Sequence, residues 1–189
     1  MKALIIHGNT RSNSNTEALA RLFADELVAK GAEVVHVELR DKDVGTCVGC
    51  DKCHAVLDAF GCVINDYMQV VAKEMLAADL VVLTSPIYSW MPTPPLKAVM
   101  DRSYAFTKYP ENADAFNLLK DQKYAMIATS GDDCDKNCDL FDESVRRMAK
   151  FAGLTYLGYL AAKDPGRGNP VKPDAAEDAR AFAAKCLNA

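Results

Sequence analysis

A run of small polar residues stands between an apolar segment and a predicted helix near the amino terminus. Residues 9 to 16 read Asn-Thr-Arg-Ser-Asn-Ser-Asn-Thr and follow the apolar segment 3 to 7. Backbone N–H groups in the first turn of a helix lack partners within it, and the helix dipole favours an anion beside them. No Gly-Lys-Ser, Gly-Lys-Thr or Gly-x-Gly-x-x-Gly occurs here. The run predicts a seat for the phosphate of a mononucleotide; turn formation and helix capping are the purely structural alternative.

A second candidate loop follows the most apolar strand of the chain. Residues 80 to 83 form an unbroken apolar run, typical of a central strand that helices cover on both faces. Ser85-Pro86-Ile87-Tyr88-Ser89-Trp90 comes next, at the strand's carboxyl end, where open α/β sheets bind their ligands. A proline, two aromatic rings and hydroxyl groups suit a flat aromatic cofactor. With the phosphate seat, this loop favours FMN over ATP or a permanently bound NAD.

Cysteines form a third candidate site. Four of the chain's 7 cysteines have the spacing C-x2-C-x2-C-x8-C, at Cys47, Cys50, Cys53 and Cys62. Steps of three resemble an iron-sulfur loop more than a zinc ribbon, which separates two C-x2-C pairs by ~15 to 20 residues. A 4Fe-4S cluster, reduced thiols and structural zinc all remain open. Cys134 and Cys138 lie among aspartates, which raise the pKa of a thiol, so we expect loop thiols there.

These loops need a scaffold that brings them together. Apolar runs predict strands at residues 3–7, 35–39, 80–84, 123–129 and 154–160, with helical segments between them. The second strand alternates apolar and polar residues, as an edge strand does. The chain is therefore expected to be an α/β protein, a flavodoxin-like doubly wound five-stranded parallel sheet of order 2-1-3-4-5 with helices on both faces. Residues 1–189 form a single FMN-binding domain in this interpretation, with a cysteine-rich insertion at 41–65 on the same rim as the cofactor.

The ends of the helices carry local signals. Ser14 and Glu17 form a capping-box pattern at the start of the first helix, and Asp174 is expected to cap the last one. A helix that starts at Pro94 should continue far enough to place Tyr104 on its apolar stripe. The neighbouring Asp101-Arg102 is interpreted as a local ion pair of small energy.

Three stretches resemble the signature segments of the NADPH-dependent FMN reductase family of flavodoxin-like oxidoreductases. They are Gly8 to Arg11 with Ser14 to Thr16, Ser85 to Tyr88, and Leu96-Lys97 with Asp101-Arg102, in this order along the chain. The resemblance implies that the cofactor contacts come from all three loops: Asn9, Arg11, Ser14, Asn15 and Thr16 at the phosphate, Pro86, Ile87, Tyr88, Ser89 and Trp90 at the ribityl chain and ring edge, and Ser130 and Gly131 on the third side. No side-chain acid or base is essential, because the flavin carries the hydride chemistry.

Composition restricts the partners. The 189 residues are 50% hydrophobic and 25% charged, with a net charge of −4 and no basic run. This balance argues against nucleic acid and anionic membranes. No apolar run suits a signal or membrane span, so we expect a cytoplasmic protein. Aromatic residues between 104 and 109, with the family resemblance, predict a homodimer or homotetramer.

Two functions follow. The first is an FMN-dependent oxidoreductase that accepts hydride from NADPH or NADH and passes electrons to a quinone, flavin, nitro compound or similar small acceptor. The second rests on the cysteine pattern, which resembles that of the iron-sulfur flavoproteins. These imply a 4Fe-4S electron carrier with ferredoxin-like partners, although many reductase relatives keep a similar cysteine-rich stretch with no cluster.

Overall fold

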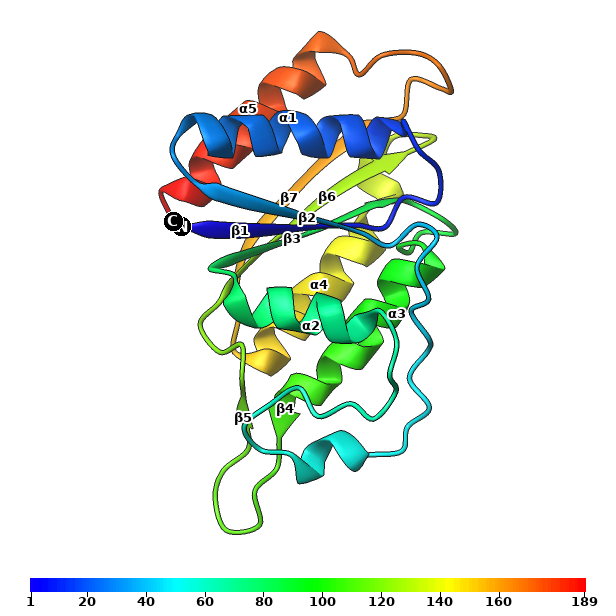
Figure 1. The fold of residues 1–189 in the computed structure, drawn as a ribbon. Helices are drawn as coiled ribbons and strands as arrows, with labels where there is room; N and C mark the ends of the chain where they lie inside the picture. Colours follow the sequence, from blue (N-terminus) through cyan, green and yellow to red (C-terminus); the bar gives the residue numbers. More distant parts are fainter.

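A computed structural model describes all residues, 1–189. Its centre is a five-stranded parallel sheet of order β2-β1-β3-β6-β7 (Figure 1). The strands are β1 (Lys2–His7), β2 (Glu33–Glu38), β3 (Leu80–Pro86), β6 (Lys123–Ser130) and β7 (Thr155–Lys163). Counted along the chain, these are the five expected strands, so the predicted order 2-1-3-4-5 is confirmed. The last strand runs three residues beyond its predicted end at 160, to Lys163.

Helices cover both faces of the sheet, as the apolar central strands require. On one face lie α1 (Asn15–Ala29) and α5 (Pro173–Leu187), and on the other lie α2 (Met68–Ala77), α3 (Pro94–Arg102) and α4 (Asp139–Ala152) (Figure 1). Alternate residues of β1 and β3 face opposite sides: Leu4 and Val81 join one hydrophobic core, and Ile5 and Val82 join the other. Each core stabilises its helices by removing apolar surface from water.

Short elements lie outside the main sheet. The 3₁₀ turns are η1 (Lys52–Ala55), η2 (Ser103–Phe106) and η3 (Cys134–Lys136), and a small antiparallel hairpin joins β4 (Thr107–Lys108) to β5 (Phe116–Asn117). This hairpin extends the molecule below α3 and was not predicted from the sequence (Figure 1). Because α3 ends at Arg102, Tyr104 lies in η2 and is exposed, so its predicted place on the apolar stripe of α3 is wrong.

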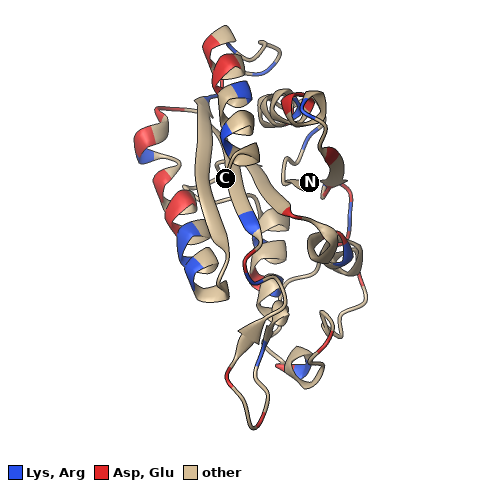
Figure 2. Cartoon of the chain, turned by 90° about the vertical axis from the view of Figure 1, so that its left-hand side faces the viewer, with Lys and Arg blue, Asp and Glu red and all other residues tan.

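The helix ends follow their signals in part. Ser14 caps α1, and its hydroxyl accepts a hydrogen bond from the Glu17 N–H at 3.1 Å. The reciprocal half of the capping box is absent, because the Glu17 carboxylate accepts from Arg21 and Asn9 instead. The expected Asp174 cap is wrong, since α5 begins one residue earlier, at Pro173. In α4, acidic residues occupy the first turn and a basic residue the last, which complements the helix dipole (Figure 2, at left).

No helix of the structure has the length and apolar character needed to cross a membrane.

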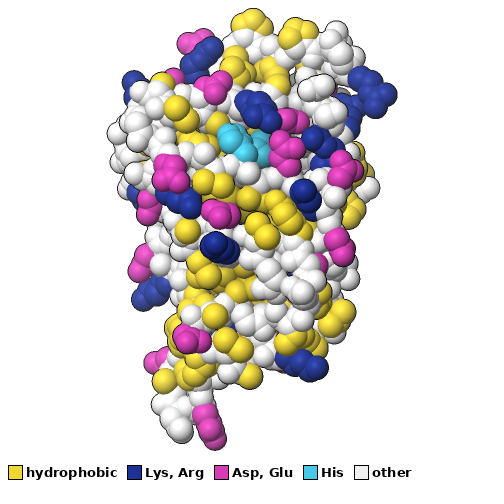
Figure 3. Space-filling model, in the orientation of Figure 1, with side chains coloured by type: hydrophobic (Ala, Val, Ile, Leu, Met, Phe, Trp, Pro, Cys, Tyr) yellow, Lys and Arg dark blue, Asp and Glu magenta, His cyan; other side chains and the backbone are white.

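Two histidines join the edge strand to its neighbour. The rings of His7 on β1 and His36 on β2 are stacked, and His7 Nε2 lies 2.8 Å from His36 Nδ1. His7 is buried, whereas His36 reaches the surface among charged side chains of both signs (Figure 3). Burial, aided by the nearby His36, lowers the pKa of His7 from 6.5 to about 4. Glu17, Arg21 and Arg40 contribute smaller effects of both signs. The folded protein therefore keeps His7 neutral.

This neutral histidine predicts a pH-dependent stability. The unfolded chain takes up a proton near pH 6.5 and the folded chain only near pH 4, so the contribution of His7 is complete above pH 6.5 and is lost as the pH falls toward 4. Between about pH 7.5 and about pH 4, we expect wild type to lose on the order of 3 kcal/mol of unfolding free energy relative to His7→Gln. Urea titrations across that range measure it, and parallel curves for the two proteins would exclude this role.

Candidate functional site

The three predicted loops meet at the carboxyl edge of the sheet. The Thr10 hydroxyl of the first loop lies 2.9 Å from the Tyr88 hydroxyl of the second. The Ile87 N–H donates to the Thr129 carbonyl at 2.8 Å, which joins the second loop to the end of β6. The Thr129 hydroxyl in turn lies 2.6 Å from that of Thr16, at the start of α1. These contacts build one composite site from segments that are far apart in the sequence.

Gly8 sets how closely the first loop approaches the second. A Cβ at this position would lie 2.8 Å from Leu96 Cβ and 2.9 Å from the Thr84 carbonyl oxygen, so a larger residue does not fit. The Thr93 hydroxyl donates to the Gly8 carbonyl, and the Thr93 N–H donates to Ser85 Oγ at 3.0 Å. The start of α3 is therefore fixed to both loops. Thr93 carries no sequence signal of its own.

The first loop offers an uninterrupted set of free donors. No backbone N–H from Thr10 to Thr16 finds a hydrogen-bond acceptor within the chain, and the next N–H, of Glu17, is taken by the Ser14 cap. These groups stand at the amino end of a 15-residue helix. A concave run of free N–H groups at a helix start is the backbone arrangement that binds phosphate. The loop therefore fits the phosphate of FMN by its backbone.

Most side chains expected at the phosphate are already engaged. Asn15 donates to Asp164 Oδ1 at 2.6 Å, and Arg11 lies 3.9 Å from the same carboxylate. Asn9 is buried and donates to the Arg11 carbonyl at 2.8 Å. Of these, only Arg11 keeps a substantially exposed side chain, 41%. Asp164, on the loop after β7, thus belongs to this site, although the sequence analysis did not identify it.

The second loop presents its aromatic rings on a strained turn. The backbones of Tyr88 and Met91 exchange hydrogen bonds of 2.9 and 3.0 Å, and between them Ser89 and Trp90 have φ of 50° and 66°. Two successive positive φ values are those of a type I′ turn, which normally takes Asn-Gly. Side chains in this conformation cost of order 1–3 kcal/mol each. Tyr88 and Trp90 are 48% and 53% exposed, and the N–H groups of Ser89 and Trp90 are free.

The third loop is open at Gly131. A Cβ at Gly131 would meet nothing within 4 Å, and the Gly131 N–H has no acceptor. Ser130 is buried and its hydroxyl bonds the backbone of Asp132, so Ser130 shapes the turn. Lys163 donates to Asp132 at 3.0 Å and to Asp133 at 3.3 Å, which holds the loop against the end of β7. The free donors and the open approach at Gly131 fit a flavin.

The cysteine segment lies elsewhere. The insertion leaves the carboxyl edge at β2, but η1 and the cysteines pack beyond the carboxyl end of α3, at the bottom of Figure 1. Since α3 has 9 residues, it separates them from the loops at the edge by about 13 Å. The expected place of the insertion on the same rim as the FMN is therefore wrong. The physical reason is that Phe60 and Phe106 pack together, which draws the insertion toward the hairpin.

All four cysteines of the motif line one cavity of about 160 Å³. Cys47 and Cys50 are exposed, and Cys53 and Cys62 are half-buried. The donor set is that of a 4Fe-4S cluster. No three of the side chains are close enough to share one metal ion. A 4Fe-4S cluster does not require this, because each of its cysteines binds a different iron. Burial raises the pKa of the Cys53 thiol, which a nearby Lys108 opposes.

Arg102, which lines this cavity, belongs to a buried ion pair. Arg102 Nη1 lies 2.5 Å from Asp66 Oδ2, and the two side chains are 1% and 4% exposed. Arg102 Nη2 also donates to Cys62 Sγ at 3.3 Å. Burial is the largest single influence on the pKa of Asp66 and raises it. The hydrogen bonds from Arg102 and from the N–H groups of Gly45 and Met68, together with the Arg102 charge, outweigh burial and lower the pKa. The expected Asp101-Arg102 pair is wrong, since Asp101 bonds Lys97 at 2.6 Å.

The remaining thiols are structural. Burial raises the pKa of Cys138 to about 12, and burial also raises that of Cys134. Nearby aspartates contribute in the expected direction, but they are a smaller cause than burial. Cys186 is fully buried in the core on α5, as its position on the last helix predicts.

Comparisons with known proteins identify related sequences. A model of the family described as NADPH-dependent FMN reductase matches residues 1–136. An iron-sulfur flavoprotein of Methanocaldococcus jannaschii is 34% identical over 103 residues, which are 54% of this chain and 52% of that protein. YwqN of Bacillus subtilis, which carries the name of an NAD(P)H-dependent FMN-containing oxidoreductase, is 26% identical over 169 residues, 89% of this chain and 86% of that protein.

Solved structures share the fold. RosB, in a structure with 8-demethyl-8-formylriboflavin-5'-phosphate bound, matches with a TM-score of 0.73 and 16% identity, covering 100% of this chain and 78% of that one. At this identity the match concerns the fold alone.

The chain spans only 52%, about half, of the length of the Methanocaldococcus jannaschii iron-sulfur flavoprotein.

The buried ion pair predicts an asymmetric mutational effect. Asp66→Asn leaves the guanidinium of Arg102 buried without a counter-charge, so we expect a loss of about 3 to 5 kcal/mol of unfolding free energy. Asp101→Asn breaks an exposed pair on the same helix as Arg102 and should cost less than about 1 kcal/mol. Urea denaturation of both variants near neutral pH measures the difference. Equal, small losses would show that Asp66 does not compensate Arg102.

Proposed function

The chain belongs to the NADPH-dependent FMN reductase family, and on that premise we propose that it takes hydride from NADPH or NADH through bound FMN and passes the electrons to a small planar acceptor. The run of free backbone N–H groups from Thr10 to Thr16 carries this proposal, because it supplies phosphate donors without any ATP-type sequence motif. The enzyme is an oxidoreductase. A quinone, a flavin or a nitro compound is the proposed class of acceptor.

The role of the chain's own residues is to bind FMN and to orient it. The first loop and Arg11 would hold the phosphate of FMN, and the end of β3 with Tyr88 and Trp90 would hold the ribityl chain and the ring edge. FMN supplies the hydride acceptance and the electron transfer when it is bound. The N–H groups of Ser89, Trp90 and Gly131 have no acceptor within the chain and would donate to negative charge on the ring. No side chain is required as an acid or base.

The exposed rings of the second loop support the choice of acceptor. Tyr88 and Trp90 offer flat apolar faces at the open side of the site, and such faces stack on planar aromatic molecules. A homodimer or homotetramer, and a cytoplasmic location, stay predictions. Exposed Tyr104, Tyr109 and Phe151, which lie side by side, are the surface that a second copy would cover.

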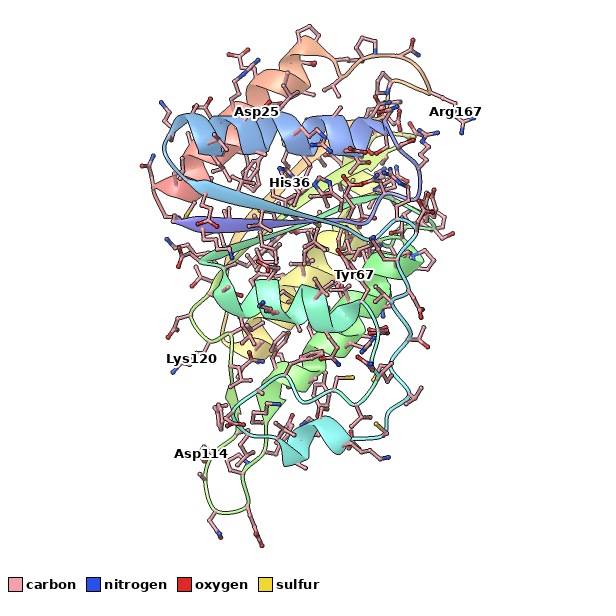
Figure 4. The ribbon with its side chains drawn as sticks, in the orientation of Figure 1. Asp25, His36, Tyr67, Asp114, Lys120 and Arg167 are labelled. Atoms are coloured by element: carbon pink, nitrogen blue, oxygen red, sulfur yellow. The ribbon has the colours of Figure 1, made fainter.

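The phosphate seat gives a direct test. Because the free N–H groups contact phosphate, FMN should bind at least about a hundredfold more tightly than riboflavin in fluorescence titrations. Arg11→Gln should weaken FMN binding about fivefold and leave riboflavin binding unchanged. Arg167→Gln is the matched control, since Arg167 projects from the loop before α5 away from the sheet (Figure 4). NADPH should then bleach the flavin absorbance without oxygen. Equal affinity for FMN and riboflavin would show that the first loop does not bind the phosphate of FMN.

A second candidate function is electron transfer through a 4Fe-4S cluster, with a ferredoxin-like protein as partner. The convergence of all four motif cysteines on one cavity favours it, together with the hydrogen bond from Arg102 to Cys62. Such a carrier would be reduced only slowly by NADPH.

Iron and acid-labile sulfide assays on protein purified without oxygen separate the two functions. The second function predicts about four of each per chain. Cys50→Ser should remove most of this iron, whereas Cys134→Ser, outside the motif, should leave it in place. A pure flavin spectrum without iron would exclude the second function and leave the reductase as the only candidate.

A further inference from the structure

Lys108 is buried without a carboxylate partner. Its side chain on β4 has no exposed surface, and its ammonium donates to the Cys53 carbonyl at 3.1 Å and to the Phe60 carbonyl at 3.2 Å. Placing a cation in the interior is costly unless an anion compensates it. Neither the reductase site nor the core explains this lysine.

One acceptor is the carbonyl of Cys53, the third cysteine of the motif, and the other is that of Phe60, two residues before the fourth, Cys62. The ammonium of Lys108 therefore closes the segment from Cys53 to Phe60 into a ring. Gly61 completes the closure, because its φ is +72° and a Cβ there would lie 2.8 Å from the Cys53 carbonyl oxygen. The next residue is Cys62, which lines the same cavity as Cys53. We call the two hydrogen bonds from Lys108 to the Cys53 and Phe60 carbonyls the clamp. The clamp brings Cys53 and Cys62 together across a long gap in the sequence.

Lys108 lies beside the cavity without an ion pair. The nearby charges of Cys53 and Asp58 act on Lys108, whereas the Arg102 guanidinium is paired with Asp66. Four thiolates that hold a 4Fe-4S core carry net negative charge, and local charge and hydrogen bonds set the reduction potential of such a centre. A cluster held by Cys53 would therefore place negative charge beside the buried ammonium of Lys108.

We propose that Lys108 is a positioning residue for an iron-sulfur cluster at Cys47, Cys50, Cys53 and Cys62. It closes the segment that brings Cys62 to Cys53, and its charge makes the cluster easier to reduce. This role rests on the second candidate function and goes beyond it, because it assigns a function to a residue outside the cysteine motif. Lys108→Gln separates the two effects, because the amide still donates to carbonyl groups but carries no charge.

The experiment uses full-length protein purified without oxygen and compares wild type, Lys108→Gln, Lys108→Met and Lys52→Gln. Lys52 adjoins Cys53 in the sequence but is exposed, so it is the matched control for the loss of one charge. Iron, sulfide and FMN per chain are assayed, and the cluster potential is measured by a redox titration followed by electron paramagnetic resonance. FMN content and circular dichroism report whether each variant folds.

We expect Lys108→Gln to keep its iron and to lower the reduction equilibrium constant of the cluster at least tenfold, about 59 mV for one electron. Lys108→Met should also lose iron, because the clamp is gone, while Lys52→Gln should match wild type in both. Equal potentials for Lys108→Gln and Lys52→Gln, with iron retained, would overturn the role of Lys108 and leave the cluster standing. Absence of iron from wild type would end the second candidate function itself and, with it, this role.

Discussion

The parallel sheet imposes the constraint on which the rest of the structure depends. Parallel neighbours must be joined by crossovers that cover both faces, so every strand ends at the same edge and every polar loop opens there. β1 and β3 are almost wholly buried, and Gly8 lets their loops approach to contact. The phosphate seat is a consequence of this packing, because the loop that leaves β1 turns at once into α1 and has no strand to occupy its N–H groups.

The strands of the sheet and the start of α1 were predictable from local sequence. Apolar runs identified all five strands, and the alternation of β2 identified it as an edge strand. Ser14 was correctly identified as a cap, because capping depends on neighbours in sequence. Asp164 and Thr93 could not be identified in this way. Their partners at Asn15 and Gly8 are remote in sequence, and nothing local distinguishes such residues from other loop or cap residues.

The position of the cysteine segment could not be predicted from the sequence. Its spacing left a cluster, zinc and free thiols open as alternatives, and its place was misjudged because tertiary packing of Phe60 decides it. Arg102 was misinterpreted for a similar reason. A neighbouring Asp101 suggests a surface pair, whereas the helical stripe turns Arg102 inward to Asp66 and Asp101 outward to Lys97. Helical periodicity could have separated these two residues, since Arg102 lies one turn after the buried Ala98 and Val99.

The turn at Ser89-Trp90 has a consequence for how this protein would change under laboratory evolution. Both residues hold a backbone conformation that suits glycine and asparagine, so the folded chain gives up stability to display an indole at the open side of its sheet. A library selected for heat resistance alone should drift toward Asn-Gly at these positions. A library selected for turnover would keep the aromatic ring, and the divergence of the two populations would report how much function the strain supports.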